Sequence, residues 1–73
     1  MIEVFKTNVS SKKHAGLLLG ILHGSFPGSN FNFDLEDCDN ILRVEASGPG
    51  IQVEEILHTV RGHNFQIEVL PDP

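Results

Sequence analysis

The sequence predicts an α+β two-layer sandwich, in which two helices cover one face of a four-stranded antiparallel sheet. Four short stretches alternate between apolar and polar residues, as strands with one buried face do. Two further stretches repeat their apolar residues at helical spacing, and the elements follow one another in the order βαββαβ. Strands that are polar on one face need helices on the other face only, which favours two layers.

The first half of the chain is expected to form a strand, a helix and a second strand. Residues 1–9 alternate with apolar residues on both faces and predict the first strand. Ser10 or Ser11 can then cap a helix, because a serine hydroxyl accepts the free N–H groups of a first turn. Residues 30–37 alternate again and predict the second strand. The apolar stripe of the helix comprises Ala15, Leu18, Leu19, Leu22 and Phe26.

The second half repeats this pattern after a turn at residues 37–40. Residues 41–47 predict a strand, and the Gly-Pro-Gly sequence at 48–50 breaks the chain. A second helix is expected at about residues 52–61, followed by a turn and a last strand. The residues of this helix and strand that are expected to face the core are Val53, Ile56, Leu57, Val60, Phe65, Ile67 and Val69. Right-handed crossovers close the whole chain, residues 1–73, most simply into one ferredoxin-like domain.

The composition argues against several functional classes. The 73 residues carry a formal net charge of −5, and neither Trp, Tyr nor a Lys/Arg cluster is present, so nucleic-acid binding is not expected. The longest apolar stretch is interrupted by Gly20 and is too short to span a membrane. The single cysteine, Cys38, excludes an internal disulfide, and the first residues do not resemble a secretory signal. We therefore expect a cytoplasmic protein. We do not expect an enzyme, because the sequence shows no recognisable set of a nucleophile, a base and a residue that orients the base.

The pattern Val9-x-Ser11-x-x-His14 lies where the first strand passes into the first helix. Together with the order and lengths of the elements over nearly the whole chain, it resembles the heavy-metal-associated (HMA) domain of copper chaperones and metal-transporting ATPases. In that family the loop carries Met-x-Cys-x-x-Cys, whose thiolates bind copper or zinc. Here Val9 takes the place of the methionine, and Ser11 and His14 take the places of the cysteines. The resemblance implies a small non-enzymatic binding or protein-interaction module that has lost the cysteine pair and needs no cofactor.

A divergent zinc or copper site is the second hypothesis. In the predicted topology His14, Cys38 and His63 lie toward the same end of the molecule, and their side chains are acceptable ligands for either metal. The alternative is that Cys38 is a turn residue and His63 a solvated loop residue. His14 would then be a half-buried histidine with one backbone partner, at the edge of the apolar face of its helix.

Two further histidines are expected to be structural. His58 falls on the side of the second helix opposite its apolar residues, and therefore faces solvent. His23 lies near the end of the first helix, where a positive charge suits the helix dipole.

The start of the first helix could also bind a small anion, which is the third hypothesis. Free N–H groups capped by Ser10 or Ser11 and flanked by Lys12 and Lys13 suit a phosphate or a carboxylate. The alternative is a solvated first turn with two exposed lysines, since no glycine-rich phosphate loop accompanies it.

Two surfaces are candidates for a protein partner or a second copy of the chain. Gly16 and Gly20 lie opposite Leu18 on the first helix, where interior glycines cost stability and could allow close approach of a partner. On the open face of the sheet, Ile2, Val4 and Ile41 are expected to form an apolar patch ringed by charge. A homodimer through this face or through an exposed edge strand is therefore possible.

Overall fold

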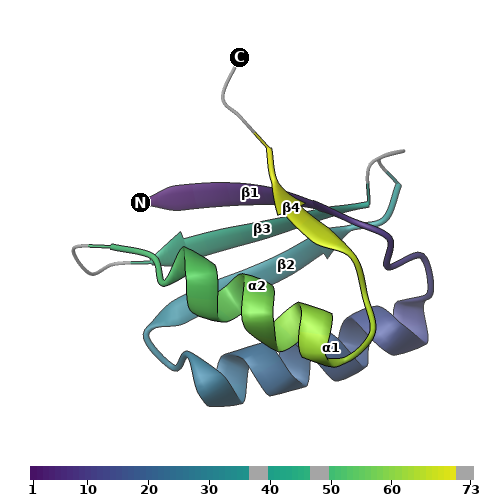
Figure 1. Ribbon diagram of the computed structural model, residues 1–73, viewed down its shortest axis with the longest axis horizontal. Coiled ribbons are helices and arrows are strands. Elements are labelled where there is room, and N and C mark those ends of the chain that lie inside the picture. Colours follow the sequence, from purple (N-terminus) through teal and green to yellow (C-terminus); the bar gives the residue numbers. More distant parts are fainter. Residues whose placement is uncertain (37–39, 47–49, 71–73) are drawn as a thin grey trace.

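The computed structural model describes residues 1–36, 40–46 and 50–70, and these form four strands and two helices (Figure 1). Neither described helix is long and apolar enough to cross a membrane. In chain order the elements are β1 (Ile2–Thr7), α1 (Lys12–Ser25), β2 (Ser29–Asp34), β3 (Ile41–Ala46), α2 (Val53–Gly62) and β4 (Ile67–Val69).

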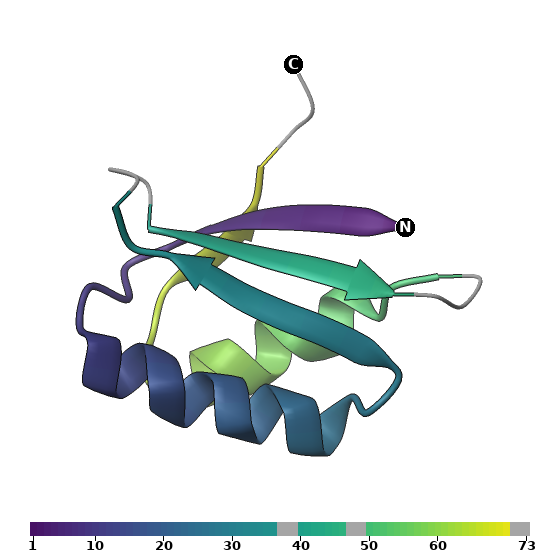
Figure 2. The ribbon, with the colours of Figure 1, turned by 180° about the vertical axis from the view of Figure 1, so that it is seen from behind.

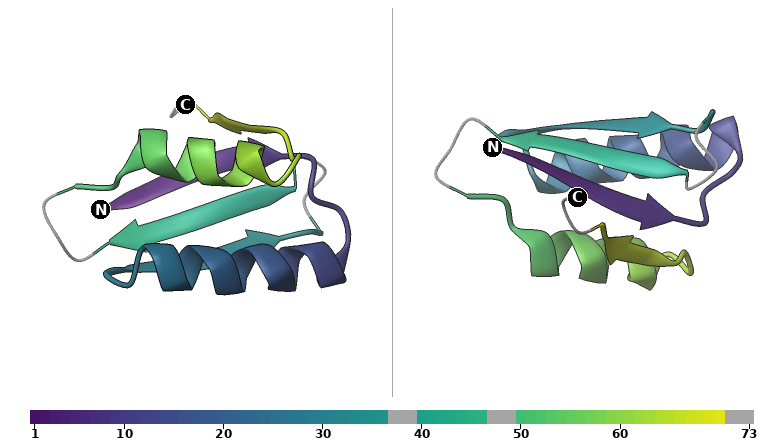
Figure 3. Two further views of the ribbon diagram at one scale, coloured as in Figure 1. Left: turned by 60° about the horizontal axis from the view of Figure 1, so that its bottom comes forward. Right: turned by 90° about the horizontal axis from the view of Figure 1, so that it is seen from above.

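The four strands form one sheet in the order β2-β3-β1-β4, and every neighbouring pair is antiparallel. Both helices lie on the same face of this sheet, as the two views of Figure 3 show. The predicted α+β two-layer sandwich is therefore confirmed. β1 and β3 are the central strands, as expected for the βαββαβ order, and β2 and β4 form the two edges.

The hydrophobic core lies between the sheet and the two helices. Phe5 of β1 and Leu42 and Val44 of β3 are fully buried, and they belong to the same core cluster as the predicted apolar stripe of α1. Leu18 and Leu22 are fully buried in that stripe and Ala15 is buried, whereas Leu19 and Phe26 are half-buried. From α2 the core receives Ile56, Leu57 and Val60. Each large side chain of this kind contributes roughly 1.5–3 kcal/mol by leaving water.

Thr7 is the one described polar residue that is buried, and its hydroxyl ties three segments together. It donates to the carbonyl of Asn40 at 2.6 Å and accepts the N–H of Val9 at 3.2 Å. Asn40 has a positive φ of 48°, a backbone conformation that asparagine tolerates better than most residues. The loop that leads from β1 into α1 is thus anchored to the start of β3.

The predicted element boundaries differ from the observed ones by three residues at most. The first strand was predicted to extend to residue 9, whereas β1 ends at Thr7; beyond this end the main-chain N–H of Asn8 still donates to the carbonyl of Gln66 at 3.2 Å. The prediction for Val69 was wrong in one respect, because its side chain is 39% exposed and not buried. Val69 is the last residue of β4, which contains three residues, of which the first, Ile67, is buried.

The prediction that Ile41 is part of an exposed patch was also wrong, because only 7% of this residue is exposed. In Figure 2 the strands of the sheet are seen above the two helices. By strand alternation Ile41 lies on the face of β3 opposite Leu42 and Val44, which is the face without helices. The register places it between Asp34 of β2 and Lys6 of β1, so it has a neighbour on both sides. Ile2 is 63% exposed, and within the described residues its one strand neighbour is Glu45 of β3, since the described pairing of β4 with β1 begins at Phe5.

Candidate functional site

The start of α1 is a capped helix end. Ser11 is its N-cap, and the Ser11 hydroxyl accepts the N–H groups of Lys13 at 3.1 Å and His14 at 3.4 Å. Ser10, Lys12 and Lys13 are exposed. An anion at this helix end would compete with the serine for two of the backbone donors that such a site uses. The geometry therefore fits helix capping directly, and the anion site stays a prediction.

His14 is exposed, so the prediction that it is half-buried with a backbone partner for its ring was wrong. Its ring lies edge-on against Phe65, with 5.4 Å between the ring centroids. Phe65 is half-buried in the connection between α2 and β4. The helical wheel places His14 at the edge of the apolar face, and the ring of Phe65 covers that edge from one side only.

The proposed metal ligands are not seen as a set. His63 is exposed at the C-terminal end of α2, and Cys38 lies outside the described residues. Within residues 1–36, 40–46 and 50–70, no three His, Cys, Asp or Glu side chains come close enough to hold a metal ion. The loops after β1 and after α2 do lie at the same end of the molecule, as Figure 1 shows.

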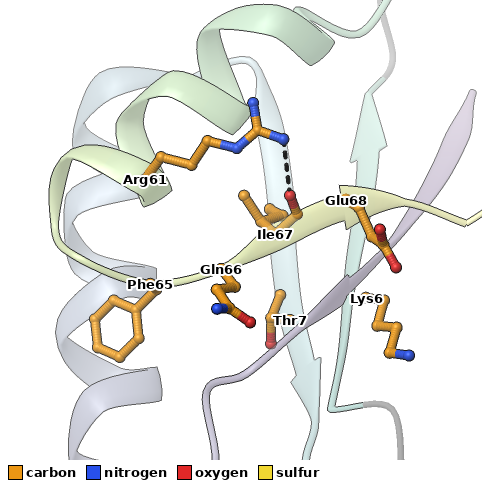
Figure 4. Close-up of a pocket in the computed structure, with 7 residues that line it drawn as sticks. All are labelled: Lys6, Thr7, Arg61, Phe65, Gln66, Ile67 and Glu68. Carbon is orange, nitrogen blue, oxygen red and sulfur yellow. Dashed lines mark hydrogen bonds between the residues drawn. The ribbon is translucent and has the colours of Figure 1, made fainter.

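The β4 edge of the sheet is held by Arg61 from α2. Its guanidinium donates to the main-chain carbonyl of Ile67 at 3.0 Å, as the dashed line in Figure 4 shows. On its other side β4 continues its pairing beyond the strand, because Asn8 accepts the N–H of Gln66 at 2.8 Å through its side chain. A hollow of about 530 Å³ lies here, lined by Lys6, Thr7, Arg61, Phe65, Gln66, Ile67 and Glu68.

The β2 edge of the sheet is held by His23 from α1. The ring nitrogen Nε2 of His23 accepts the N–H of Phe31 at 3.3 Å, and the two rings meet edge-on at 5.5 Å between centroids. The N–H of Ser29, two residues earlier and therefore on the same edge, donates to the carbonyl of Phe26 at 3.1 Å. The first half of the β2 edge is thus already bonded within the chain.

The second half of the β2 edge is open and borders a groove. By strand alternation the N–H and C=O of Phe33 point to the same outer edge as those of Phe31, and no described residue is recorded as binding them. The groove runs between α1 and β2 and encloses about 600 Å³. Its lining residues are Lys12, Ala15, Gly16, Leu19, Asn32, Phe33, Asp34, Leu35, Glu36 and Arg43.

The floor of this groove is apolar and incompletely covered. Leu19, Phe33 and Leu35 are all half-buried, and all pack against the main core. Gly16 forms part of the helical wall, where the absence of a side chain leaves the groove wide. A Cβ added at Gly16 would meet no atom within 4 Å, and the same holds at Gly20. Packing within the described residues therefore gives no reason for glycine at either position.

The open face of the sheet offers a smaller apolar patch than predicted. Ile2 is exposed, Val4 is half-buried and Ile41 is buried, so only the first two present apolar surface. They stand beside Glu45 and Arg43, their partners on β3. Among these three residues the patch is therefore apolar over Ile2 and Val4.

The two helix side chains that hold the sheet edges, His23 and Arg61, were not predicted from the sequence as edge-binding residues. His23 was assigned to the helix dipole, and Arg61 was given no role. A signal was present for His23, because it falls at helical spacing with Lys12, Gly16 and Leu19 along one side of α1. The sequence does not say which strand that side of the helix faces. His58, in contrast, is exposed as predicted.

Comparisons with family models, with curated proteins and with solved structures give no match for this chain.

Proposed function

We propose that this protein is a small non-enzymatic interaction module that binds an extended polypeptide segment in the groove between α1 and β2. One observation carries the proposal: three half-buried apolar side chains form the floor of a groove beside an unpaired strand edge. An extended segment can add to such an edge through main-chain hydrogen bonds while its alternate side chains enter the groove. The volume of about 600 Å³ is in the range of ligand-binding clefts.

Gly16 supports this function. Glycine in a helix interior is about 0.8–1.0 kcal/mol less stable than alanine, and nothing within the described chain fills the space that a side chain would occupy there. A bound segment supplies a reason for that space. The HMA-like scaffold expected from the sequence fits this role as well, since it would keep the fold and replace metal transfer by protein contact.

A library of random ten-residue peptides displayed on phage tests the proposal. We expect the protein to select extended peptides with apolar residues at alternate positions, and we expect Gly16→Leu to abolish their binding. Gly20→Leu is the matched control, because it adds the same side chain to the same helix outside the groove. Selected peptides that bind both variants equally well would contradict the proposal, and so would a failure to select any.

A further inference from the structure

We propose that the occupant of this groove is the β2 edge of a second copy of the same chain, paired antiparallel around a two-fold axis near Phe33. The inference rests on the proposed function, because it names the partner for the same groove. Antiparallel pairing about a two-fold axis is isologous, so each copy offers the other the same surface. The two four-stranded sheets would join at their β2 edges.

The position of the free backbone groups selects the centre of this pairing. Ser29 and Phe31 already donate their outer N–H groups to Phe26 and His23. Phe33 is the next residue on that edge, and within the described residues its outer groups have no recorded partner. A pair centred on Phe33 exchanges two main-chain hydrogen bonds between the copies. The half of β2 that is bonded within the chain then lies away from the axis.

The charges around the groove are self-complementary. Lys12 and Arg43 are cationic, and Asp34 and Glu36 are anionic. No ion pair among these four is recorded in the part of the chain that the structure describes, and the Asp34 carboxylate accepts only the N–H of Glu36, at 3.2 Å. Equal numbers of both signs give no preference for a strongly basic or strongly acidic partner, whereas a two-fold axis brings unlike charges together.

The register shows which charges meet. Within one copy, Arg43 stands beside Asn32 in the β2–β3 pair. Pairing centred on Phe33 places Asn32 directly beside Asp34 of the second copy, on the open face of the sheet. Arg43 and the second copy's Asp34 are then separated only by the short side chain of Asn32, which the long arginine side chain can cross. The same contact is repeated by symmetry.

Apolar contact completes the interface. The side chains of Phe33 and Leu35 lie on the helix side of β2 and line the groove with Leu19. In the two-fold arrangement the same three residues of both copies come together, and Gly16 leaves room for the second copy beside α1. The floor that is half-buried in one copy would be covered in the dimer.

Sedimentation equilibrium at protein concentrations up to about 1 mM tests the inference. We expect a concentration-dependent dimer for the wild type and for Gly20→Leu, and a monomer for Gly16→Leu. Arg43→Glu should weaken the dimer at least about tenfold, because it places like charges together. The double exchange Asp34→Arg/Arg43→Glu should restore it. Both strand positions are exposed, so these variants leave the core intact; circular dichroism verifies the fold of each variant.

A wild type that stays monomeric at every concentration would overturn the inference. A dimer that persists in Gly16→Leu, or one that the double exchange fails to restore, would also overturn it. These outcomes are separate from a failure of the proposed function: phage-selected peptides whose binding needs Gly16 would keep the groove as a binding site for a different protein. A synthetic peptide with the sequence of residues 29–36 should compete with the dimer if the inference holds, and an inert peptide would contradict it.

Discussion

The β2 and β4 edges of the sheet each receive a side chain from the helix beside them, and they differ in what that side chain binds. On β2 the His23 ring accepts an N–H, and on β4 the Arg61 guanidinium donates to a C=O. Exposed strand edges are sites of unwanted pairing unless something covers them. β4 is protected by its length of three residues as well as by Arg61. β2 has six residues, and within the described part of the chain only Ser29 and Phe31, in its first half, have hydrogen bonds on the outer edge.

This difference shows that hydrogen bonds from within the chain cover one part of a strand edge in this small domain and leave another part open. The bonded half of β2 lies beside the end of α1, where the connection from helix to strand turns back on itself. The free half lies beside the start of α1, next to the groove and Gly16. The half of the β2 edge that lacks a hydrogen-bond partner among the described residues therefore also borders the apolar floor of the groove.

The largest difference in stability between changes at the two edges should come from removing the ring of Phe31 on β2. Phe31 is 2% exposed and contacts both His23 and Phe26. Phe31→Ala should lower the free energy of unfolding by about 3–4 kcal/mol, since it leaves a large cavity. Urea unfolding followed by circular dichroism measures this value. The control on the other edge is Val69→Ala, which should cost less than about 1 kcal/mol because Val69 is already partly exposed.

Replacing the histidine itself should have two opposite effects. His23→Ala removes one hydrogen bond and one edge-on ring contact, and should cost about 1–2 kcal/mol of monomer stability. It also frees the Phe31 N–H for intermolecular pairing, so the variant should associate more strongly than the wild type in sedimentation equilibrium. His58→Ala is the control, because His58 is exposed on α2 and has no recorded contact of this kind. A loss of stability without stronger association would show that His23 does not restrict pairing at β2.

The matching change at the other edge should be smaller. Arg61→Ala releases the Ile67 carbonyl to water and should cost about 0.5–1 kcal/mol, as expected for a partly exposed hydrogen bond. It should not promote association, because β4 is too short to pair with another chain on its own. Thermal unfolding and light scattering check both statements. Lys13→Ala, an exposed helical position with no such bond, serves as the reference. Dimer formation by Arg61→Ala would remove the distinction between the two edges.

The smallest effect can be measured in the wild type by amide hydrogen exchange. In dilute protein, where the monomer prevails, the amide of Phe31 should exchange with deuterium at least about tenfold more slowly than the amide of Phe33, since only the former is hydrogen-bonded. Nuclear magnetic resonance resolves both amides. At high concentration the Phe33 amide should become protected if the β2 edges pair. Equal exchange at both positions in the dilute protein would contradict the description of β2 as half bonded.

Much of the fold could be predicted because its signals are local. The spacing of Leu18 and Leu22 predicts the buried side of α1, and the structure confirms it. Ser11 was one of two predicted caps and is the observed one. The end of β1 was placed too late, because the alternation of apolar and polar residues continues past Thr7, the last residue of the strand.

The candidate site was harder to predict, because it depends on which elements become neighbours. Gly16 was singled out, but the sequence could not show that its side of the helix faces the free half of β2. Ile41 was assigned to the correct face, yet its burial depends on Asp34 and Lys6, which belong to two other strands. The metal hypothesis depends in part on Cys38, which lies outside the described residues.

The sequence by itself determined the order of the elements, most of the residues that face the core and a serine cap for α1, since periodicity and capping act within a few residues of chain. Only the tertiary structure decided which parts of the two sheet edges are covered by side chains. His23 and Arg61 meet Phe31 and Ile67 because the helices pack beside the outer strands. The groove exists because β2 lies at the edge of the sheet, and strand order is a property of the whole fold.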